Sequence, residues 1–292
     1  MFSNHTLSSF FSPSEWLGLP ANYSLHGDQV DHTIDVVHWL MIVLFVGWTI
    51  FFFVCLFKFG QKKNAKASYL GVKNHVSTHL EIGVIIIEAV LLLGFALPLW
   101  GERTDSFDRV IQEENEVRVR AIGYQFGWKF HYAGNDGVFG FIDRDLVKGP
   151  GDACIYPDDP NGFDDFVAST LKLPVLRPAI VQVTSTDVIH NFGIVPMRVQ
   201  QDAFPGKDIP MWFTPLEELE TSVVCGQLCG EGHANMVGTM VIESEKVFTK
   251  WSGDLSSDAY ESNKAAYDAR QVAAEKAEAE RASHAGQSSH DH

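Results

Sequence analysis

Residues 36–57 read VVHWLMIVLFVGWTIFFFVCLF, a run of 22 residues without Asp, Glu, Lys or Arg. A helix of that length rises about 33 Å, which is enough to cross the hydrocarbon core of a membrane. A second run, IGVIIIEAVLLLGFALPLW at residues 82–100, has one charged residue, Glu88. The alternative for either run is a buried helix of a large soluble domain. We predict two membrane-spanning helices, which together form a transmembrane hairpin over residues 36–100.

The charges beside the two runs predict the orientation of the hairpin. The connector between the runs, residues 58–80, contains five lysines and no acid, whereas residues 1–35 contain four acids and no Lys or Arg. Lysine excess marks the cytoplasmic side of a membrane. We therefore expect both ends of the hairpin on the outer side, with residues 1–35 as an external amino-terminal segment.

The composition of the whole chain excludes two broad classes of protein. Its 292 residues carry a net charge of −15, and most of the acid excess lies beyond residue 100. No nucleic-acid partner is expected, because phosphates require a basic surface. The four cysteines are too few for a disulfide-stapled scaffold. Any function of the cysteines is therefore expected to be local.

The chain beyond the hairpin predicts a folded external domain over residues 101–250. Short β-rich runs separated by turn residues favour an antiparallel sandwich or barrel. The runs are 117–122, 127–132, 179–184, 209–214, 221–224 and 236–243. An insertion at 133–169, rich in Gly, Pro and Asp, is either an elaboration with its own purpose or a mobile surface segment. Residues 251–292 are expected to be a solvated helix or a disordered charged tail, since they have few large apolar residues to bury.

The candidate metal ligands lie near the end of this domain, where residues 225–236 read CGQLCGEGHANM. Four possible ligands stand there at intervals of four, four and three residues: Cys225, Cys229, His233 and Met236. His190 precedes Cys225 by 35 residues, in the segment TDVIHNFGI. Thiolates, imidazoles and a thioether favour copper or zinc over magnesium or calcium.

Two kinds of metal centre are compatible with these ligands. One tetrahedral zinc would use two cysteines and two histidines, but zinc has little use for a thioether. Copper uses a weak axial methionine, and two thiolates on one loop can bridge two copper ions. Each copper then needs one imidazole, which His190 and His233 can supply. The pattern favours dinuclear copper, with a structural zinc as the alternative.

With these residues the sequence resembles subunit II of the haem-copper cytochrome c oxidases over residues 30–250. The resemblance rests on the loop Cys-x3-Cys-Gly-x2-His-x2-Met, on an upstream Asp-x-x-His, and on the run QQDAFPGK at 200–207. It implies an α+β membrane protein, in which a two-helix transmembrane hairpin is followed by a cupredoxin-like antiparallel β-barrel. The external domain would then carry the dinuclear copper centre called CuA.

The same resemblance implies a role for each candidate ligand. Cys225 and Cys229 would bridge the two coppers. His190 and His233 would bind one copper each. Met236 would be a weak axial ligand, and the backbone carbonyl of Gln227 would supply the other weak axial contact.

The function that the resemblance implies is that of an electron-relay subunit of a terminal oxidase. Such a subunit accepts electrons from cytochrome c, or from a cytochrome c domain, and passes them to catalytic subunit I. Oxygen is reduced to water at haem and copper in that other chain, so no catalytic residue is expected in this one. Other oxidase subunits are further expected partners of this part of a proton-translocating oxidoreductase. No haem is expected, because the chain has no Cys-x2-Cys-His sequence.

The implied location is a bacterial inner membrane. Both ends of the chain would lie outside the cytoplasm. The copper domain would lie in the periplasm or on the topologically equivalent side.

Three features depart from the pattern of many relatives. Gln227 stands where they have a glutamate that helps to bind magnesium or manganese, and since hard dications prefer carboxylates, tight binding of that ion is not expected. In GYQFGWKF, Phe126 replaces the first tryptophan of an electron-entry patch and Trp128 keeps the second; core packing is the alternative. Glu81 matches a carboxylate at the mouth of a proton pathway. Glu88 stands where many relatives have proline, and a helix–helix hydrogen bond is the alternative to a proton-relay role.

Other functional classes share parts of this pattern. A membrane-anchored copper-delivery or thiol-redox protein of the thioredoxin-like kind also uses Cys-x3-Cys and a distant histidine, but one span and a βαβ pattern are expected of it. The second subunit of a quinol oxidase shares the hairpin and barrel but lacks the copper ligands. Nitrous oxide reductase has the same loop on a soluble chain, beside a large catalytic domain.

Overall fold

The computed structural model describes residues 12–63, 66, 69, 75–105 and 115–287. The chain divides into two compact units. The first contains Met1–Asn22 and His26–Asp108, and the second contains Tyr23–Leu25 and Arg109–His292. Lys73, one of the connector lysines on which the predicted orientation rests, lies outside the described residues, as do residues 288–292 of the predicted tail.

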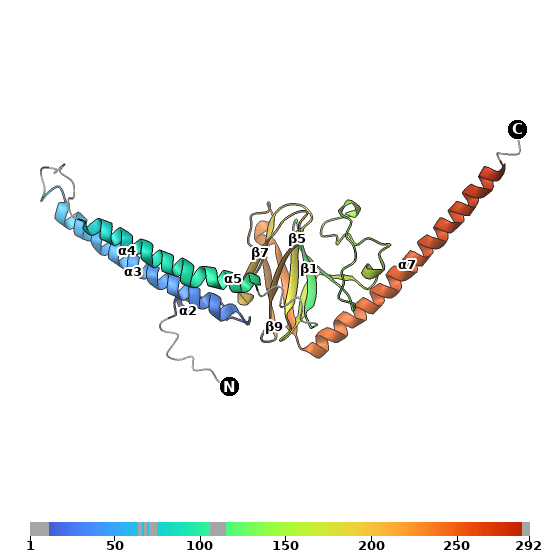
Figure 1. The fold of residues 1–292 in the computed structure, drawn as a ribbon, viewed down its shortest axis with the longest axis horizontal. Helices are drawn as coiled ribbons and strands as arrows, with labels where there is room; N and C mark the ends of the chain where they lie inside the picture. Colours follow the sequence, from blue (N-terminus) through green and yellow to red (C-terminus); the bar gives the residue numbers. More distant parts are fainter. Residues whose placement is uncertain (1–11, 64–65, 67–68, 70–74, 106–114, 288–292) are drawn as a thin grey trace. The chain divides into compact units, whose positions relative to one another are not determined.

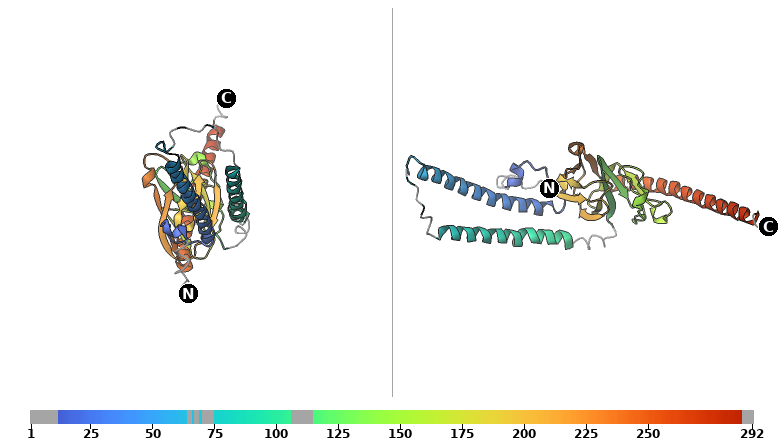
Figure 2. Two further views of the ribbon diagram at one scale, coloured as in Figure 1. Left: turned by 90° about the vertical axis from the view of Figure 1, so that its left-hand side faces the viewer. Right: turned by 90° about the horizontal axis from the view of Figure 1, so that it is seen from above.

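The first unit is helical (Figures 1 and 2). Its helices are α2 (Pro13–Trp16), α3 (Gly27–Phe59), α4 (Val76–Leu91), the π-helical turn η2 (Leu92–Ala96) and α5 (Leu97–Asp105). The last three run on continuously, and both α3 and the helix Val76–Thr104 are long and apolar enough to cross a membrane. The residues in the most apolar part of each helix are not buried by the other described parts of the chain. Both predicted spans are therefore present as helices, and each helix is longer than its apolar run.

Pro98 explains the irregular turn in the second long helix. A proline inside a helix donates no hydrogen bond, and its ring clashes with the carbonyl four residues earlier, which here belongs to Gly94. The π-helical turn Leu92–Ala96 ends two residues before this proline. A wider turn keeps the carbonyl clear of the ring without ending the helix.

The short helix α2 folds back on the beginning of α3. The Ser12 hydroxyl and the Ser14 backbone N–H both donate to the carboxylate of Asp35, at 2.6 and 2.7 Å. Trp16 and Trp39 pack edge to face, with their ring centroids 5.5 Å apart. These contacts fix the amino-terminal end of the first long helix.

The second unit is a β domain with ten strands among its described residues, arranged in two five-stranded sheets (Figure 1). The first sheet has the order β3-β2-β1-β5-β8 and the second β4-β10-β9-β6-β7. The strands are β1 (Val117–Tyr124), β2 (Gly127–Tyr132), β3 (Phe166–Ala168), β4 (Thr170–Pro174), β5 (Ala179–Ser185), β6 (His190–Ile194), β7 (Val199–Ala203), β8 (Ile209–Phe213), β9 (Leu219–Cys225) and β10 (Val237–Glu243).

The predicted cupredoxin-like domain is confirmed, but its sheets are mixed and not purely antiparallel. β1 pairs with β5 in parallel, and so does β10 with β4. The other strand pairs of the described chain are antiparallel. The direction of pairing follows from the connections. A tight turn joins β1 to β2, so these two strands are antiparallel. Many residues separate β1 from β5 and β4 from β10, and a long connection lets strands pair in parallel.

The six predicted β-rich runs are all strands, and four further strands were not predicted. The missed strands are β3, β4, β6 and β7. β6 reads HNFGI and β7 reads VQQDA, sequences whose Asn, Gly, Gln and Asp residues have low β propensity. Pairing with neighbouring strands overrides that propensity here.

The core lies between the two sheets. Val119 and Ala121 of β1, Val181 and Val183 of β5, and Phe192 of β6 are fully buried. Their alternation along each strand is the pattern expected when one face of a sheet packs on the other sheet. Tyr23–Leu25 from the amino-terminal segment also join this unit through backbone hydrogen bonds, for example from the Leu25 N–H to the Thr214 carbonyl at 3.1 Å.

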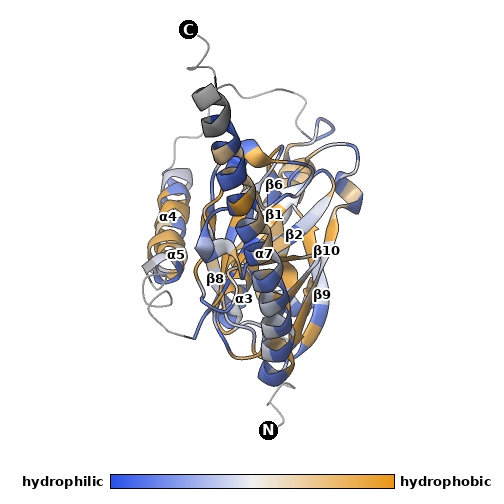
Figure 3. Ribbon diagram, turned by 90° about the vertical axis from the view of Figure 1, so that its right-hand side faces the viewer, coloured by the Kyte–Doolittle hydropathy of each residue, from blue (hydrophilic) through white to orange (hydrophobic). Residues whose placement is uncertain are grey.

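The carboxyl-terminal helix α7 (Glu245–Gln287) begins earlier than the predicted tail and packs on the β domain. Phe248 is buried, and Trp251 and Leu255 pack against the core. The expectation of a solvated tail from residue 251 is therefore wrong for the first turns, because these three apolar residues recur at the spacing of one helix face. From Gln271 to Arg281 the side chains are exposed. Figure 3 shows the contrast between this largely hydrophilic helix and the apolar α4.

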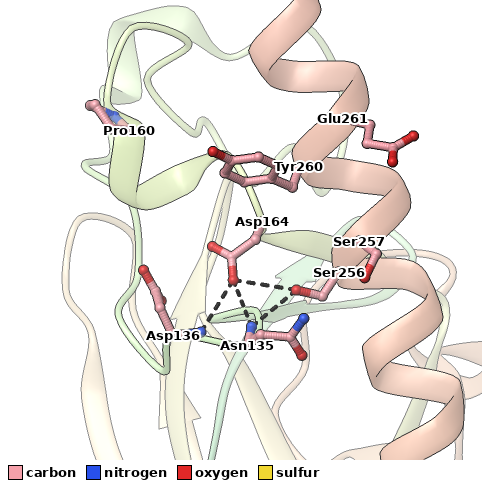
Figure 4. Close-up of a pocket in the computed structure, with 8 residues that line it drawn as sticks. All are labelled: Asn135, Asp136, Pro160, Asp164, Ser256, Ser257, Tyr260 and Glu261. Atoms are coloured by element: carbon pink, nitrogen blue, oxygen red, sulfur yellow. Dashed lines mark hydrogen bonds between the residues drawn. The ribbon is translucent and has the colours of Figure 1, made fainter.

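The insertion 133–169 packs against α7. The Asp164 carboxylate accepts hydrogen bonds from the backbone N–H groups of Asn135 and Asp136, at 2.6 and 3.2 Å, and from the Ser256 hydroxyl of α7 (Figure 4). The Asn263 amide donates to the Phe163 carbonyl at 2.9 Å. Of the two expectations for this stretch, a mobile surface segment does not fit such internal bonding.

Candidate metal centre

The ligand loop, residues 225–236, joins β9 to β10. Cys225 is the last residue of β9, and Met236 stands directly before β10. The Cys225 N–H donates to the Met236 carbonyl at 3.3 Å, which closes the loop at its base. A single helical turn, His233–Asn235, directs the loop back. The two ends of the motif are thus held by the antiparallel pairing of β9 with β10.

His190 reaches the loop from the neighbouring strand. It is the first residue of β6, and in the pairing of β6 with β9 Phe192 lies opposite Cys225. The His190 Nδ1 atom lies 3.9 Å from the Cys225 sulfur. Strand register, not closeness in sequence, brings these two residues together.

The predicted ligands converge on the two sulfur atoms. The sulfurs of Cys225 and Cys229 are 3.8 Å apart. The Cys229 sulfur lies 3.6 Å from His233 Nδ1 and 3.7 Å from the Met236 sulfur. The Gln227 backbone carbonyl lies 3.2 Å from the Cys225 sulfur, so each cysteine has one imidazole and one weak donor beside it.

The orientation of His190 is set by Asp187. The imidazole is fully buried, and its Nε2 donates to the Asp187 carboxylate at 2.8 Å, so that Nδ1 faces Cys225. Partial burial acts to raise the pKa of Asp187, but hydrogen bonds from His190 and from the backbone N–H groups of Gln125 and Val188 lower it overall. The carboxylate is therefore ionised at neutral pH and holds one imidazole tautomer.

The donor chemistry of the cluster fits a soft or borderline metal ion. His190, Cys225 and Cys229 offer ligand atoms that lie within 4.8 Å of one another. Burial and the adjacent Cys225 thiol raise the pKa of Cys229 to about 11. Sulfur and imidazole donors gathered this closely are the kind that copper and zinc prefer.

The two aromatic residues of the predicted entry patch differ in exposure. Phe126 is 42% exposed in the turn between β1 and β2, next to the ligand loop, whereas Trp128 is 3% exposed. The Trp128 ring packs edge to face on His190 and on Phe192, with centroid distances of 6.1 and 5.4 Å. Trp128 therefore touches a candidate ligand, and Phe126 lies at the surface.

Glu81 and Glu88 belong to the other unit and are not part of the cluster. Both lie on α4 with exposed side chains, seven residues apart and thus on one helix face. Within the described residues, no hydrogen bond joins Glu88 to α3, so the structure offers no support for a helix–helix hydrogen bond, which was the alternative to a proton-relay role.

Two residues of the site, Gln125 and Asn191, were not predicted from the sequence. The Gln125 side chain donates to the Cys229 carbonyl at 2.7 Å. The Asn191 carbonyl accepts from the Gly226 N–H at 3.1 Å, and its amide donates to Asp202 at 2.7 Å. Asp202 stands in the QQDAFPGK run, which was the only signal for this contact. Gln125 had no signal, because its partner lies 104 residues away.

A β domain of cupredoxin-like fold, with convergent cysteines and histidines and two apolar helices before it in the chain, fits a membrane-anchored protein with a candidate metal site. Residues 117–245 match the family model described as cytochrome c oxidase subunit II, periplasmic domain. The β domain thus matches the periplasmic domain of cytochrome c oxidase subunit II, and the chain is similar to subunit II proteins over most of its length. This similarity supports a subunit of an oxidoreductase complex, which implies other oxidase subunits.

Individual relatives cover most of the chain. An alternative cytochrome c oxidase subunit 2 of Bradyrhizobium diazoefficiens is 28% identical over 84% of this chain and 85% of its own length. Cytochrome c oxidase subunit 2 of Cereibacter sphaeroides is 28% identical over 77% of this chain and 78% of its own. The solved periplasmic domain of cytochrome oxidase subunit II of Bradyrhizobium japonicum is 26% identical, covers 50% of this chain and 96% of that one, and has a TM-score of 0.37.

Proposed function

We propose that this chain is the electron-relay subunit of a terminal oxidase. It accepts electrons from cytochrome c at a dinuclear copper centre and passes them to the haem-copper catalytic subunit, where oxygen is reduced to water. The observation that carries the proposal is the convergence of His190, Cys225, Cys229, His233 and Met236 on one pair of sulfur atoms.

The arrangement of donors supports two copper ions over one zinc. The ligands divide into two sets that share the sulfurs: His190 with the Gln227 carbonyl beside Cys225, and His233 with Met236 beside Cys229. One tetrahedral zinc would leave the thioether and the carbonyl without a role. Two coppers bridged by both thiolates would use every donor. When bound, such a centre supplies one-electron redox chemistry with little change in bond lengths.

The chain's own residues hold the ligands still. The ionised Asp187 fixes the His190 ring, the pairing of β9 with β10 fixes both ends of the ligand loop, and a buried core lies beneath. Ligands held by rigid strands and by hydrogen-bonded partners move little when the charge of the centre changes. This rigidity is what a relay needs, because slow rearrangement would limit electron transfer.

The route of electron entry passes through the aromatic residues beside the loop. Phe126 is the exposed member and would meet the donor, while Trp128 contacts His190 from the interior. The donor is cytochrome c or a cytochrome c domain. Glu81 is proposed as the carboxylate at the mouth of a proton pathway into the catalytic subunit, with a weaker case for Glu88 as a relay.

The proposed placement is a bacterial inner membrane, with the hairpin Gly27–Phe59 and Val76–Thr104 crossing it and the copper domain in the periplasm. Both chain ends lie on that side. A tightly bound magnesium or manganese ion is not part of the proposal, because Gln227 supplies no carboxylate.

Metal analysis of the full-length chain purified from its native membrane tests the proposal. Two coppers per chain are expected, with the near-infrared absorption and EPR spectrum of a centre whose unpaired electron is shared. One zinc and no copper would overturn it. Cys229→Ser should abolish the centre, whereas Met236→Leu should keep both coppers at a changed redox potential. Cys154→Ser is the matched control, since Cys154 is a free cysteine outside the ligand loop and its loss should leave the copper content unchanged.

A further inference from the structure

The turn between β1 and β2 rests on the ligand loop. β1 ends at Tyr124 and β2 begins at Gly127, so Gln125 and Phe126 form the tip of the turn. The Gln125 amide nitrogen donates to the Cys229 carbonyl at 2.7 Å. This bond ties the backbone of a candidate bridging cysteine to a turn in the opposite sheet.

The backbone of the same residue holds the partner of a second ligand. The Gln125 N–H donates to one carboxylate oxygen of Asp187 at 2.7 Å, and the other oxygen accepts from His190 at 2.8 Å. One residue therefore connects Cys229 on the ligand loop with the carboxylate that orients His190 on β6. One of these ligands lies on the ligand loop and the other on β6, and Gln125 contacts the support of each.

The ligand loop is shaped to receive this turn. Gly230 has φ +138°, and a Cβ there would lie 2.8 Å from the Gln125 amide nitrogen. A Cβ on Gly232 would lie 2.5 Å from the Phe126 ring. Side chains at these two positions would push the turn away. Two glycines thus permit the close approach that the Gln125 bond requires.

We propose that Gln125 is a positioning residue for the metal centre, which fixes the Cys229 backbone relative to His190 without itself binding metal. The inference rests on the proposed function in that the ligands are taken to hold copper. Hydrogen-bonding partners behind a ligand commonly change metal affinity by about 10- to 100-fold when removed. Loss of the Gln125 amide should therefore loosen the centre while leaving every ligand in place.

The experiment compares Gln125→Met and Gln125→Glu in the full-length chain in detergent. Both keep the length of the side chain and remove its N–H donor. Gln200→Met is the matched control, because Gln200 lies on β7 with an exposed side chain. Copper is added alone, and three quantities are measured: copper per chain, the rate of copper loss to a chelator, and the redox potential. Amide hydrogen exchange over residues 225–236 is measured on the metal-free protein.

Both Gln125 variants are expected to bind the same amount of copper as the parent chain. They should lose it about tenfold faster, with a shifted redox potential and faster exchange in the metal-free ligand loop. Loss rates, potential and exchange equal to those of Gln200→Met would overturn the inference. The two proposals fail separately: a parent chain that binds no copper contradicts the proposed function, while the exchange measurement still decides whether Gln125 holds the loop.

Discussion

Gln227 stands between the two candidate bridging cysteines with an exposed side chain, and its carbonyl, not its carboxamide, faces Cys225. The side chain is thus available to a neighbouring ion but brings no charge. Hard divalent cations prefer carboxylates. We therefore predict that manganese-supplemented growth gives no tightly held manganese in the purified oxidase. EPR spectroscopy of the purified complex measures the bound manganese directly.

The variant Gln227→Glu is the counterpart of this measurement. It restores a carboxylate on the same backbone and should strengthen manganese binding if the local geometry suits the ion. A stoichiometric manganese signal in the unaltered protein would contradict the prediction and would show that other ligands compensate for Gln227.

His131 is fully buried between Arg120 and Asp165. Its Nε2 donates to Asp165 at 2.8 Å, and Arg120 donates to its Nδ1 at 3.0 Å. Since arginine only donates, Nδ1 carries no proton. Burial lowers the pKa of His131 from its ordinary value of 6.5, although the bond to Asp165 acts in the opposite direction. A second proton on the ring would lie on Nδ1 and would face the positively charged Arg120 guanidinium, which is also a donor.

The sign of the resulting pH dependence follows from linkage. With the folded-state pKa below 6.5, the unfolded chain binds a proton more readily, so stability is fully present above pH 6.5 and is lost as the pH falls below it. The free energy of unfolding should fall by up to about 1.4 kcal/mol per pH unit from this group. The dependence of the free energy of unfolding on pH is measured by urea unfolding of the full-length chain at about pH 7.5, 6.5 and 5.5. In His131→Gln the slope should be smaller, and an unchanged slope would rule out His131 as its source.

At the scale of elements, the first turns of α7 form part of the core of the β domain. Phe248 is buried, and its ring lies 5.8 Å from that of Trp251. Truncation of a buried phenylalanine to alanine costs about 3–5 kcal/mol, because apolar surface is lost and a cavity remains. We predict this loss in the free energy of unfolding for Phe248→Ala, measured by urea unfolding of the full-length chain.

Val272 lies on the same helix but is 65% exposed, which makes Val272→Ala the control. It should change the free energy of unfolding by less than about 0.5 kcal/mol. Equal losses in the two variants would mean that α7 is bound along its whole length, and no loss in either would mean that its first turns do not stabilise the domain.

For the molecule as a whole, the net charge of −14 over residues 101–292 should favour encounter with a basic cytochrome c. Opposite charges accelerate association at low salt, and salt screens them. Part of the acidic run 158–166 is not available for this attraction, since Asp164 and Asp165 are buried and Asp158 pairs with Arg270 at 3.1 Å. Exposed acids elsewhere must supply the field. We predict that stopped-flow reduction by soluble cytochrome c slows steeply with ionic strength.

The same measurement with Trp128→Phe examines the entry route, and a slower reduction is expected. The alternative for the donor is a permanently docked cytochrome domain, with Phe126 and the insertion 133–169 as parts of a fixed interface. A fast reduction that does not depend on salt, together with copurification of a haem c protein, would favour that alternative over the steered encounter.

Features that are local along the chain can be predicted from the amino-acid sequence alone. Two apolar runs predicted two long helices, since helix length and hydropathy are read from consecutive residues. The spacing from Cys225 to Met236 predicted four candidate ligands, because residues so close in sequence can share one loop. Short β-rich runs predicted six strands, since β propensity is also read from consecutive residues.

Features that join distant residues depend on how the elements pack in three dimensions. Arg120, His131 and Asp165 form one buried network, and Gln125 meets Cys229 across 104 residues. The parallel pairing of β1 with β5 and the packing of Phe248 belong to the same class. Periodicity along the chain says which face of an element is apolar, but not which other element covers it. Strand register and packing choose the partner, and a shift of one residue would turn every side chain to the opposite face.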